Sequence, residues 1–404
     1  GYYRFGDALV YQLVSKVDDV ASYYVLAAVP LFVFMGVMLE RSGIAEKLFE
    51  AIHLWTRRLP GGLAVGTVIL CVVFAAASGV VGATEAVVGL LAIPIMMRYA
   101  YNKALISGTI CAGGSLGTII PPSVVVVILA PVADVSVGDL FVGMLIPGLL
   151  LAALYIVYII GRCMIWPEDG PRLPPDPSDP GLMEKLYITA TAMILPLFLI
   201  FAVLGTIVLG WATPTEAAAM GAIGTVILTI VYGQFDFKTL HASFMKTLQV
   251  TAMILTILLG GTMFAGVFVA LGGISAVEGL TSAANLTSTQ TIFILLLLAF
   301  LAGFVLDLIS IVLIIIPVAI AIMRKMGVDD VWFCIMFLVV IQTSYLTPPM
   351  APAIFYLRGI SPPEITLGNM YRGVIPFIVI ELIVLGLVYF FPALALWLPE
   401  LVFG

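Results

Sequence analysis

Small hydroxyl residues and Pro-Pro pairs occur together in two apolar stretches of the chain. The first, 113–123, reads Gly-Gly-Ser-Leu-Gly-Thr-Ile-Ile-Pro-Pro-Ser, and the second, 342–350, reads Gln-Thr-Ser-Tyr-Leu-Thr-Pro-Pro-Met. Proline lacks a backbone N–H and clashes with the preceding turn, so each pair breaks a helix and frees carbonyl groups that lipid cannot solvate. Carbonyl and hydroxyl oxygens are the ligands that a dehydrated cation needs. Two such breaks at matching places predict the binding site of a secondary transporter.

The composition places these stretches in a membrane protein. Of the 404 residues, 62% are hydrophobic and 10% are charged, whereas soluble domains carry about 25% charged residues. The formal net charge of −6 includes no basic block, which argues against a nucleic-acid partner. The four cysteines have neither metal-site nor disulfide spacing, so we expect them to pack in the core. We therefore expect an all-α polytopic protein in a lipid bilayer.

Two apolar runs, 63–97 and 291–323, are too long for a single membrane crossing. The first, with about 35 residues, would measure about 52 Å as a helix, against a hydrocarbon core of about 30 Å. Two crossings need about 40 residues and a turn, so each run is predicted to form a re-entrant hairpin. The first tip is expected at Ser78-Gly79-Val80-Val81-Gly82 and the second at Asp307.

The order of these features predicts a chain built from two related halves. A Pro-broken helix follows each hairpin, at 104–133 and at 332–357, and a Pro-rich cytoplasmic linker at 163–185 separates a first repeat, 1–162, from a second, 186–404. Further landmarks recur in the same order, beginning with Phe34-Met35-Gly36-Val37 and Phe264-Ala265-Gly266-Val267, which are 230 positions apart. Internal repeats of this kind are the sequence signature of many secondary transporters.

The charged residues predict that the two halves are inverted. Lys and Arg concentrate on the cytoplasmic side of membrane proteins, and basic residues flank the first hairpin at Arg41, Lys47, Arg57, Arg58, Arg98 and Lys103. Counting crossings from there places Asp134 and Asp139 outside, the linker inside and the second hairpin opening outside. Arg358 and Arg372 then return to the inside.

Three smaller expectations follow from the same comparison. Arg324 and Lys325 break the charge rule, and we expect Asp329 and Asp330 to neutralise them. Ser136 and Ser361 are each followed three residues later by an acidic residue, a pattern typical of helix N-caps. The second half has two spans, 186–209 and 216–232, before its Phe264 landmark, so we expect the natural polypeptide to carry a further N-terminal helix.

The chain resembles the large membrane subunit of tripartite ATP-independent periplasmic (TRAP) transporters. The similarity extends over essentially the whole chain and rests on the combination of segments 29–36, 78–84, 119–123, 212–219 and 346–349. It implies sodium-driven import of an organic acid by an elevator mechanism, in which a transport domain holding both hairpins and broken helices slides against a scaffold. It also implies a multi-pass location in a bacterial inner membrane, with sodium as coupling ion and without another cofactor.

The resemblance implies two protein partners and a class of substrate. The partners are a smaller four-helix membrane (Q) subunit and a periplasmic substrate-binding protein that delivers a small carboxylate. The segment 355–363 is most similar to members that handle 2-oxo acids and related carboxylates. A transporter of this family is not an enzyme.

The broken helices and hairpin tips also allow two sodium sites to be predicted from the residues themselves. Unwound carbonyls and hydroxyls replace the water of a sodium ion without a large fixed charge. The first predicted site consists of Ser78, Gly79, Gly82, Gly113, Gly114, Thr118 and Pro121. The second consists of Asp307, Thr343, Ser344, Thr347 and Met350. Ser123 is a predicted substrate contact, because the half-helix that follows it points a positive dipole end inward.

For four of these assignments, a structural role is an alternative to the functional one. Helix-interior Ser and Thr often bond back to a carbonyl one turn earlier instead of coordinating an ion. A carboxylate in the bilayer costs about 2.5 to 3.5 kcal/mol on insertion scales, which favours a functional role for Asp307. Glu85 is able to bind a cation or proton, or to cap the second arm of the first hairpin. Arg358 is a candidate for interface anchoring or for substrate binding.

Two other functions also fit parts of the sequence. An intramembrane hydrolase would use Glu85 and Asp307 as paired carboxylates, but the repeat places them on hairpins that open to opposite faces. A passive channel would conduct without ion coupling. Sodium dependence of uptake and electrical recordings separate these alternatives from transport.

Overall fold

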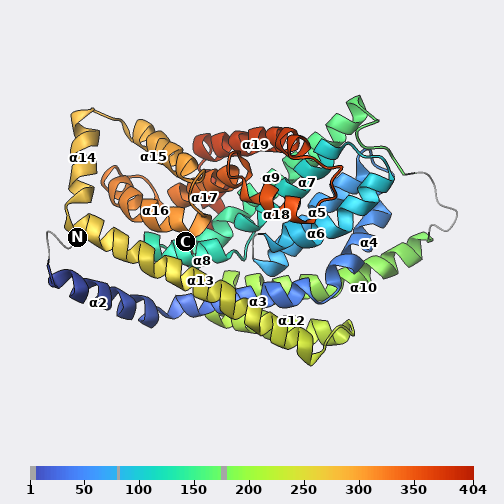
Figure 1. The fold of residues 1–404 in the computed structure, drawn as a ribbon, viewed down its shortest axis with the longest axis horizontal. Helices are drawn as coiled ribbons and strands as arrows, with labels where there is room; N and C mark the ends of the chain where they lie inside the picture. Colours follow the sequence, from blue (N-terminus) through green and yellow to red (C-terminus); the bar gives the residue numbers. More distant parts are fainter. Residues whose placement is uncertain (1–5, 80–81, 174–179) are drawn as a thin grey trace.

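The fold is known from a computed structural model that describes residues 6–79, 82–173 and 180–404. Val80 and Val81 of the predicted first tip, and 174–179 of the predicted linker, lie outside the described residues. Every regular element in the described ranges is helical (Figure 1). The first part of the chain forms α2 (Ala8–Ser22), η1 (Tyr24–Ala27), α3 (Ala28–Glu40), α4 (Ile44–Thr56), α5 (Gly62–Ser78), α6 (Ala83–Arg98), α7 (Lys103–Ser115), η2 (Leu116–Thr118), α8 (Val124–Ala133) and α9 (Val137–Ile165).

The second part begins after the Pro-rich segment. It forms α10 (Leu182–Ile200), η3 (Phe201–Gly205), α11 (Thr206–Val208), α12 (Pro214–Val231), α13 (Phe237–Ala270), α14 (Gly273–Ala283), α15 (Ser288–Ala302), α16 (Leu308–Lys325), α17 (Asp330–Leu346), α18 (Pro352–Ile360), α19 (Leu367–Phe390) and α20 (Ala393–Phe403). In Figure 1, α2, α3, α10, α12 and α13 run along one side of the molecule, and the shorter paired helices gather on the other.

Several helices are long and apolar enough to cross a membrane. In the described ranges there are six, or seven if the pair α2 and α3, bent by 63°, counts as one span. The six are Val137–Ile165, Leu182–Val208, Pro214–Val231, Phe237–Ala270, Leu308–Lys325 and Leu367–Phe390. The chain is therefore an all-helical, multi-pass membrane protein, as the composition predicts.

Each long apolar run forms two helices. The run 63–97 becomes α5 and α6, which pack on each other, and the run 291–323 becomes α15 and α16, which do the same. Glycine ends α5, because Gly79 has a φ of +64° that few other residues adopt. Asp307 begins α16 as its N-cap.

The Pro-Pro pairs interrupt the helices that follow. Residues 119–123 separate α7 and η2 from α8, and residues 347–351 separate α17 from α18. Both Pro-Pro peptide bonds are cis. Pro352 occupies the first position of α18, where the missing N–H costs no hydrogen bond.

Helices from the two parts of the chain pack in reciprocal pairs. Helix α6 packs on α18, and α16 packs on α8, so the second arm of each hairpin contacts the half-helix that follows the other break. In the same way α7 packs on α19, and α9 packs on α17. The two halves therefore exchange equivalent contacts.

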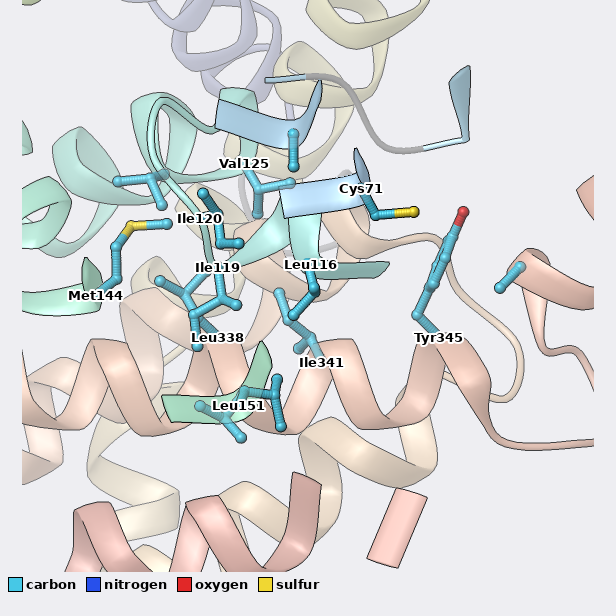
Figure 2. Close-up of a cluster of buried hydrophobic side chains, with 14 of the residues drawn as sticks. Cys71, Leu116, Ile119, Ile120, Val125, Met144, Leu151, Leu338, Ile341 and Tyr345 are labelled. Atoms are coloured by element: carbon cyan, nitrogen blue, oxygen red, sulfur yellow. The ribbon is translucent and has the colours of Figure 1, made fainter. Parts of the chain in front are cut away.

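Apolar side chains fill the space between the first break and α17. Figure 2 shows Leu338 and Ile341 of α17 beside Leu116 and Ile119, with Leu151 of α9 on the same cluster. All five side chains are buried. This packing holds the first break against the unbroken part of the second broken helix.

One of the smaller sequence expectations is wrong, and another is confirmed in part. Ser361 does not cap α19, since its hydroxyl donates to the Leu357 carbonyl at 2.7 Å and Thr366 is the N-cap of α19. The guanidinium of Arg324 pairs with Asp330 at 2.6 Å and, at 3.5 Å, with Asp134 from the other half. Asp329 is the N-cap of α17.

Ser136 is the N-cap of α9 as predicted and accepts a hydrogen bond from the Asp139 amide.

Candidate binding site between the hairpin tips

A cavity of about 190 Å³ lies where both hairpins meet both broken helices. The loop residue Gly79 and the α16 N-cap Asp307 line it from the two hairpins. Val124, at the start of α8, and Tyr356, on α18, line it from the half-helices after the breaks. Helix α13 closes another side through Val250, Met253 and Ile254. Residues far apart in the sequence thus meet around one cavity.

The first hairpin loop is tied to the first break. The Gly79 carbonyl accepts a hydrogen bond from the Val124 amide at 3.2 Å. A β-carbon at Gly79 would lie 2.6 Å from the Pro122 carbonyl oxygen, so only glycine permits this approach. The loop and the start of α8 therefore have a fixed relative position.

The second hairpin loop packs just as closely on the second broken helix. A β-carbon at Gly303 would lie 2.1 Å from Ser344 Oγ. At the other end of the loop the Asp307 carboxylate accepts hydrogen bonds from the Ile309 amide at 3.1 Å and from the Ser310 amide and hydroxyl. The Asp307 side chain is exposed and lines the cavity. The hydrogen bonds that cap α16 stabilise the Asp307 carboxylate at this position without a bound ion. Because the carboxylate lines the cavity, an ion is also able to reach it.

Glu85 is fully buried at the start of α6 and does cap that helix. Its Oε2 accepts a hydrogen bond from the Gly82 amide at 2.9 Å, whereas its Oε1 has no hydrogen-bond partner in the described structure. The carboxyl group packs on Gly114, where a β-carbon would lie 2.3 Å from Glu85 Cδ. Tyr345 of α17 also lies beside this carboxylate. Glu85 thus connects the first hairpin to both broken helices.

The predicted hydroxyl ligands divide into two groups. Ser78 Oγ and Ser123 Oγ are buried and have no hydrogen-bond partner among the described residues. The other four donate to backbone carbonyls three or four residues earlier: Thr118, Thr343, Ser344 and Thr347. Such a bond uses the hydroxyl proton and leaves oxygen lone pairs free. All six oxygens therefore retain the capacity to bind a cation.

The remaining predicted residues have different surroundings. Gly113 approaches α5, since a β-carbon there would lie 2.6 Å from Cys71 Sγ. Pro121 lies in the first break and is buried. Met350 lies in the second break and is 44% exposed. Arg358 Nη1 donates to the Ile365 carbonyl at 2.9 Å, and Arg358 is not among the residues that line the cavity, so the structure gives it an anchoring contact.

Sequence reasoning missed a second buried carboxylate. Glu381, on α19, is fully buried and accepts a hydrogen bond from the Tyr155 hydroxyl at 2.9 Å. Nearby, Gln342 Nε2 donates to Ser115 Oγ at 3.2 Å. The signal was present, because Glu381 interrupts an apolar run of the last long span and intramembrane carboxylates indicate function.

Comparison with known proteins agrees with this geometry. Residues 2–394 match the family model described as tripartite ATP-independent periplasmic transporter, DctM component. The chain belongs to this family. The resemblance noted from the sequence is therefore confirmed.

Three relatives illustrate the range of the family. The C4-dicarboxylate TRAP transporter large permease protein DctM of Pseudomonas aeruginosa is 30% identical, over 98% of this chain and 91% of that protein. The sialic acid TRAP transporter large permease protein SiaM of Vibrio cholerae is 29% identical, over 97% and 89%. The isethionate TRAP transporter permease protein DctMQ of Oleidesulfovibrio alaskensis is 29% identical, over 92% and 58%. These relatives are transport proteins and not enzymes.

A solved structure shares the fold. The YdaH transporter of Alcanivorax borkumensis superposes with a TM-score of 0.66 over 98% of this chain and 90% of that one. Its sequence identity of 17% limits the likeness to the fold. The chain is thus a TRAP large permease with a helical transporter fold.

Proposed function

We propose that this TRAP permease imports an organic acid by sodium-coupled secondary transport across a bacterial inner membrane. The cavity between the two hairpin loops and the two breaks carries the proposal, because it joins elements that supply carbonyls, hydroxyls and one carboxylate. The named substrates of two relatives, C4-dicarboxylates and sialic acid, are carboxylates. A small carboxylate is therefore the proposed cargo, and the 2-oxo acids are a narrower candidate class.

Two sodium ions would bind beside the cavity. The first would use Ser78, whose hydroxyl is buried without a partner, together with Gly79, Gly82, Gly113, Gly114, Thr118 and Pro121. The second would use Asp307 with Thr343, Ser344, Thr347 and Met350. The close packing of each hairpin loop on a break supports both sets, since coordination requires oxygens from the two elements to converge.

The substrate carboxylate would bind at the start of α8. The first-turn amides of a helix and its dipole favour an anion, and Val124 and Val125 at this end line the cavity. Ser123 precedes them with a buried hydroxyl that has no partner in the described structure. We assign substrate contact to Ser123 and not to Arg358.

The reciprocal packing of the helices supports an elevator with inverted repeats. Helix α6 packs on α18 and α16 packs on α8, and α17 contacts both α7 and α8, so the hairpins and broken helices form one connected body. In the proposal this body is the transport domain, and the long helices on the other side of Figure 1 belong to the scaffold. The first repeat is 1–162 and the second is 186–404.

The proposed machinery includes two further proteins. A periplasmic binding protein would deliver the acid, and a small membrane (Q) subunit would complete the scaffold. The name DctMQ of the isethionate relative, and the 58% of that protein that the chain covers, fit a fusion of large and small subunits.

Uptake by the reconstituted three-protein complex tests the proposal. Proteoliposomes receive a labelled C4-dicarboxylate or sialic acid on its cognate binding protein, with or without an inward sodium gradient. We expect uptake only with both the gradient and the binding protein. The variant Ser78→Ala should weaken sodium dependence, whereas Ser361→Ala, whose hydroxyl donates to the Leu357 carbonyl, should not. Uptake without sodium, or passive equilibration, contradicts the proposal.

A further inference from the structure

Glu381 lies where four helices, α7, α9, α17 and α19, pack together. It is on α19, the hydroxyl that donates to it comes from Tyr155 on α9, and the side chains of Thr343, Gln342 and Ser115 lie beside its carboxyl group. These three residues lie near the ends of α17 and α7, just before the two breaks. None of the groups that interact with Glu381 in the described part of the chain is basic.

The described residues around Glu381 supply no positive charge to balance its carboxylate. Glu381 Oε2 and Gln342 Oε1 are both buried and have no hydrogen-bond partner among the described residues. Both atoms are acceptors, and a buried carboxylate without a compensating charge is strongly disfavoured. The cluster therefore requires a positively charged occupant or a proton.

The chemistry of the surrounding atoms matches a dehydrated monovalent cation. The atoms facing the carboxylate are oxygens of hydroxyl and amide groups, which are hard ligands without additional charge. The C-terminal ends of α7 and α17 add the negative ends of two helix dipoles. A single carboxylate balances one positive charge.

We propose that these residues form a third sodium site, which is buried and additional to the two at the hairpin loops: Ser115, Tyr155, Gln342, Thr343 and Glu381. This site rests on the proposed function, since it would hold a further coupling ion. Thr343 belongs to both sets and would link the third site to the second. Tyr155 is a positioning residue for the carboxylate, because its hydroxyl fixes Oε1 and leaves Oε2 toward the ion.

Equilibrium binding of ²²Na⁺ to the purified membrane complex tests the site. Glu381→Gln keeps the side-chain shape and the acceptor for Tyr155, and it should bind one sodium ion fewer per chain than the unmodified complex. Glu400→Gln, an exposed carboxylate on α20, should bind the full number. Equal stoichiometry in Glu381→Gln and the unmodified complex overturns the site and indicates a protonated, structural carboxyl group.

A second pair of variants applies if Glu381→Gln does not fold. Tyr155→Phe removes the hydroxyl and should weaken sodium affinity about tenfold, since a hydrogen bond to a charged group is lost. Tyr158→Phe is its matched control, because both tyrosine rings pack edge-on against Phe377, at 5.0 and 5.2 Å. Equal affinity in the two variants overturns the site. Absence of any sodium binding by the unmodified complex contradicts the proposed coupling as a whole.

Discussion

Ser344 occupies the space in which a β-carbon at Gly303 would stand. An ideal β-carbon on Gly303 would lie 2.1 Å from Ser344 Oγ and 2.4 Å from Ser344 Cβ. The second hairpin loop therefore rests directly on the last turn of α17, one of the helices that break at a Pro-Pro pair. This contact couples the position of the loop to the proposed second sodium site.

Gly303→Ala should separate the second hairpin loop from α17. Inserting a methyl group into such a close contact costs about 1–3 kcal/mol. We expect a lower melting temperature and a loss of sodium-dependent uptake. Fluorescence-detected thermal unfolding and proteoliposome uptake measure the two effects.

The swap Gly303→Ala with Ser344→Gly separates packing from coordination. It restores the missing space, although a glycine within α17 costs about 1 kcal/mol relative to alanine. We expect the swap to recover protein yield and melting temperature but not sodium dependence, since the Ser344 hydroxyl is absent. Full recovery of sodium dependence would remove Ser344 from the proposed site.

The loop at Gly303 also shows what the sequence can predict. Run length alone indicated that 291–323 turns back on itself, because neither one crossing nor two fits about 33 apolar residues. Run length does not say which residue caps the second arm. Asp307 was interpreted as a functional carboxylate within the bilayer, and the structure adds that it is an exposed helix N-cap that lines the cavity. A polar residue at a hairpin loop avoids the free-energy cost of burial in the bilayer when it faces a cavity.

Other parts of the site depend on contacts that no local pattern encodes. Ser361 and Glu364 match the capping pattern, yet the cap bond forms between the Asn369 amide and the Thr366 hydroxyl, where no acidic residue marks it. The pairing of Arg324 with Asp134 joins residues 190 positions apart. The polar cluster around Glu381 likewise needs four helices to cross. Sequence spacing predicts elements and their order, and tertiary packing decides which polar atoms remain unpaired.

Glu85→Ala should destabilise the first hairpin. The change leaves the Gly82 amide without its 2.9 Å acceptor, and an unsatisfied buried donor costs about 1–3 kcal/mol. Glu85→Gln keeps an acceptor and should lose less. Thermal unfolding of the purified protein measures both variants, with exposed Glu400→Gln as the control.

The contact between Glu85 and Gly114 makes this prediction more specific. Gly114→Ala alone would place a β-carbon 2.3 Å from Glu85 Cδ and should destabilise the fold. In the double variant the smaller alanine at 85 makes room, so its destabilisation should be less than the sum of the single effects. Strict additivity would show that the two residues do not share this contact.

Asp236→Asn should reduce the loss of stability in acid. The Thr239 amide and hydroxyl donate to Asp236 and hold the pKa of this carboxyl below its usual range. A depressed pKa contributes stability that is present above the unfolded pKa of about 3.9 and is lost as the pH falls through the lower folded value. The melting temperature of the variant should therefore change less between about pH 5 and pH 3 than that of the unmodified protein. Asp7→Asn is the matched control, because the Asp7 side chain makes no cap bond to α2.

Cysteine labelling in intact cells tests whether the two halves are inverted. All four native cysteines are buried, so the unmodified chain should react little with a membrane-impermeant maleimide. Leu59 is an exposed residue just before the first hairpin, and Ser288 is an exposed residue at the start of the second. If the repeats are inverted, Ser288→Cys reacts in intact cells, whereas Leu59→Cys reacts only after permeabilisation. Glu184→Cys, near the linker, should behave like Leu59→Cys. Labelling of both hairpin positions from the same side would contradict inverted repeats, because inversion requires the corresponding ends of the two hairpins to face opposite compartments.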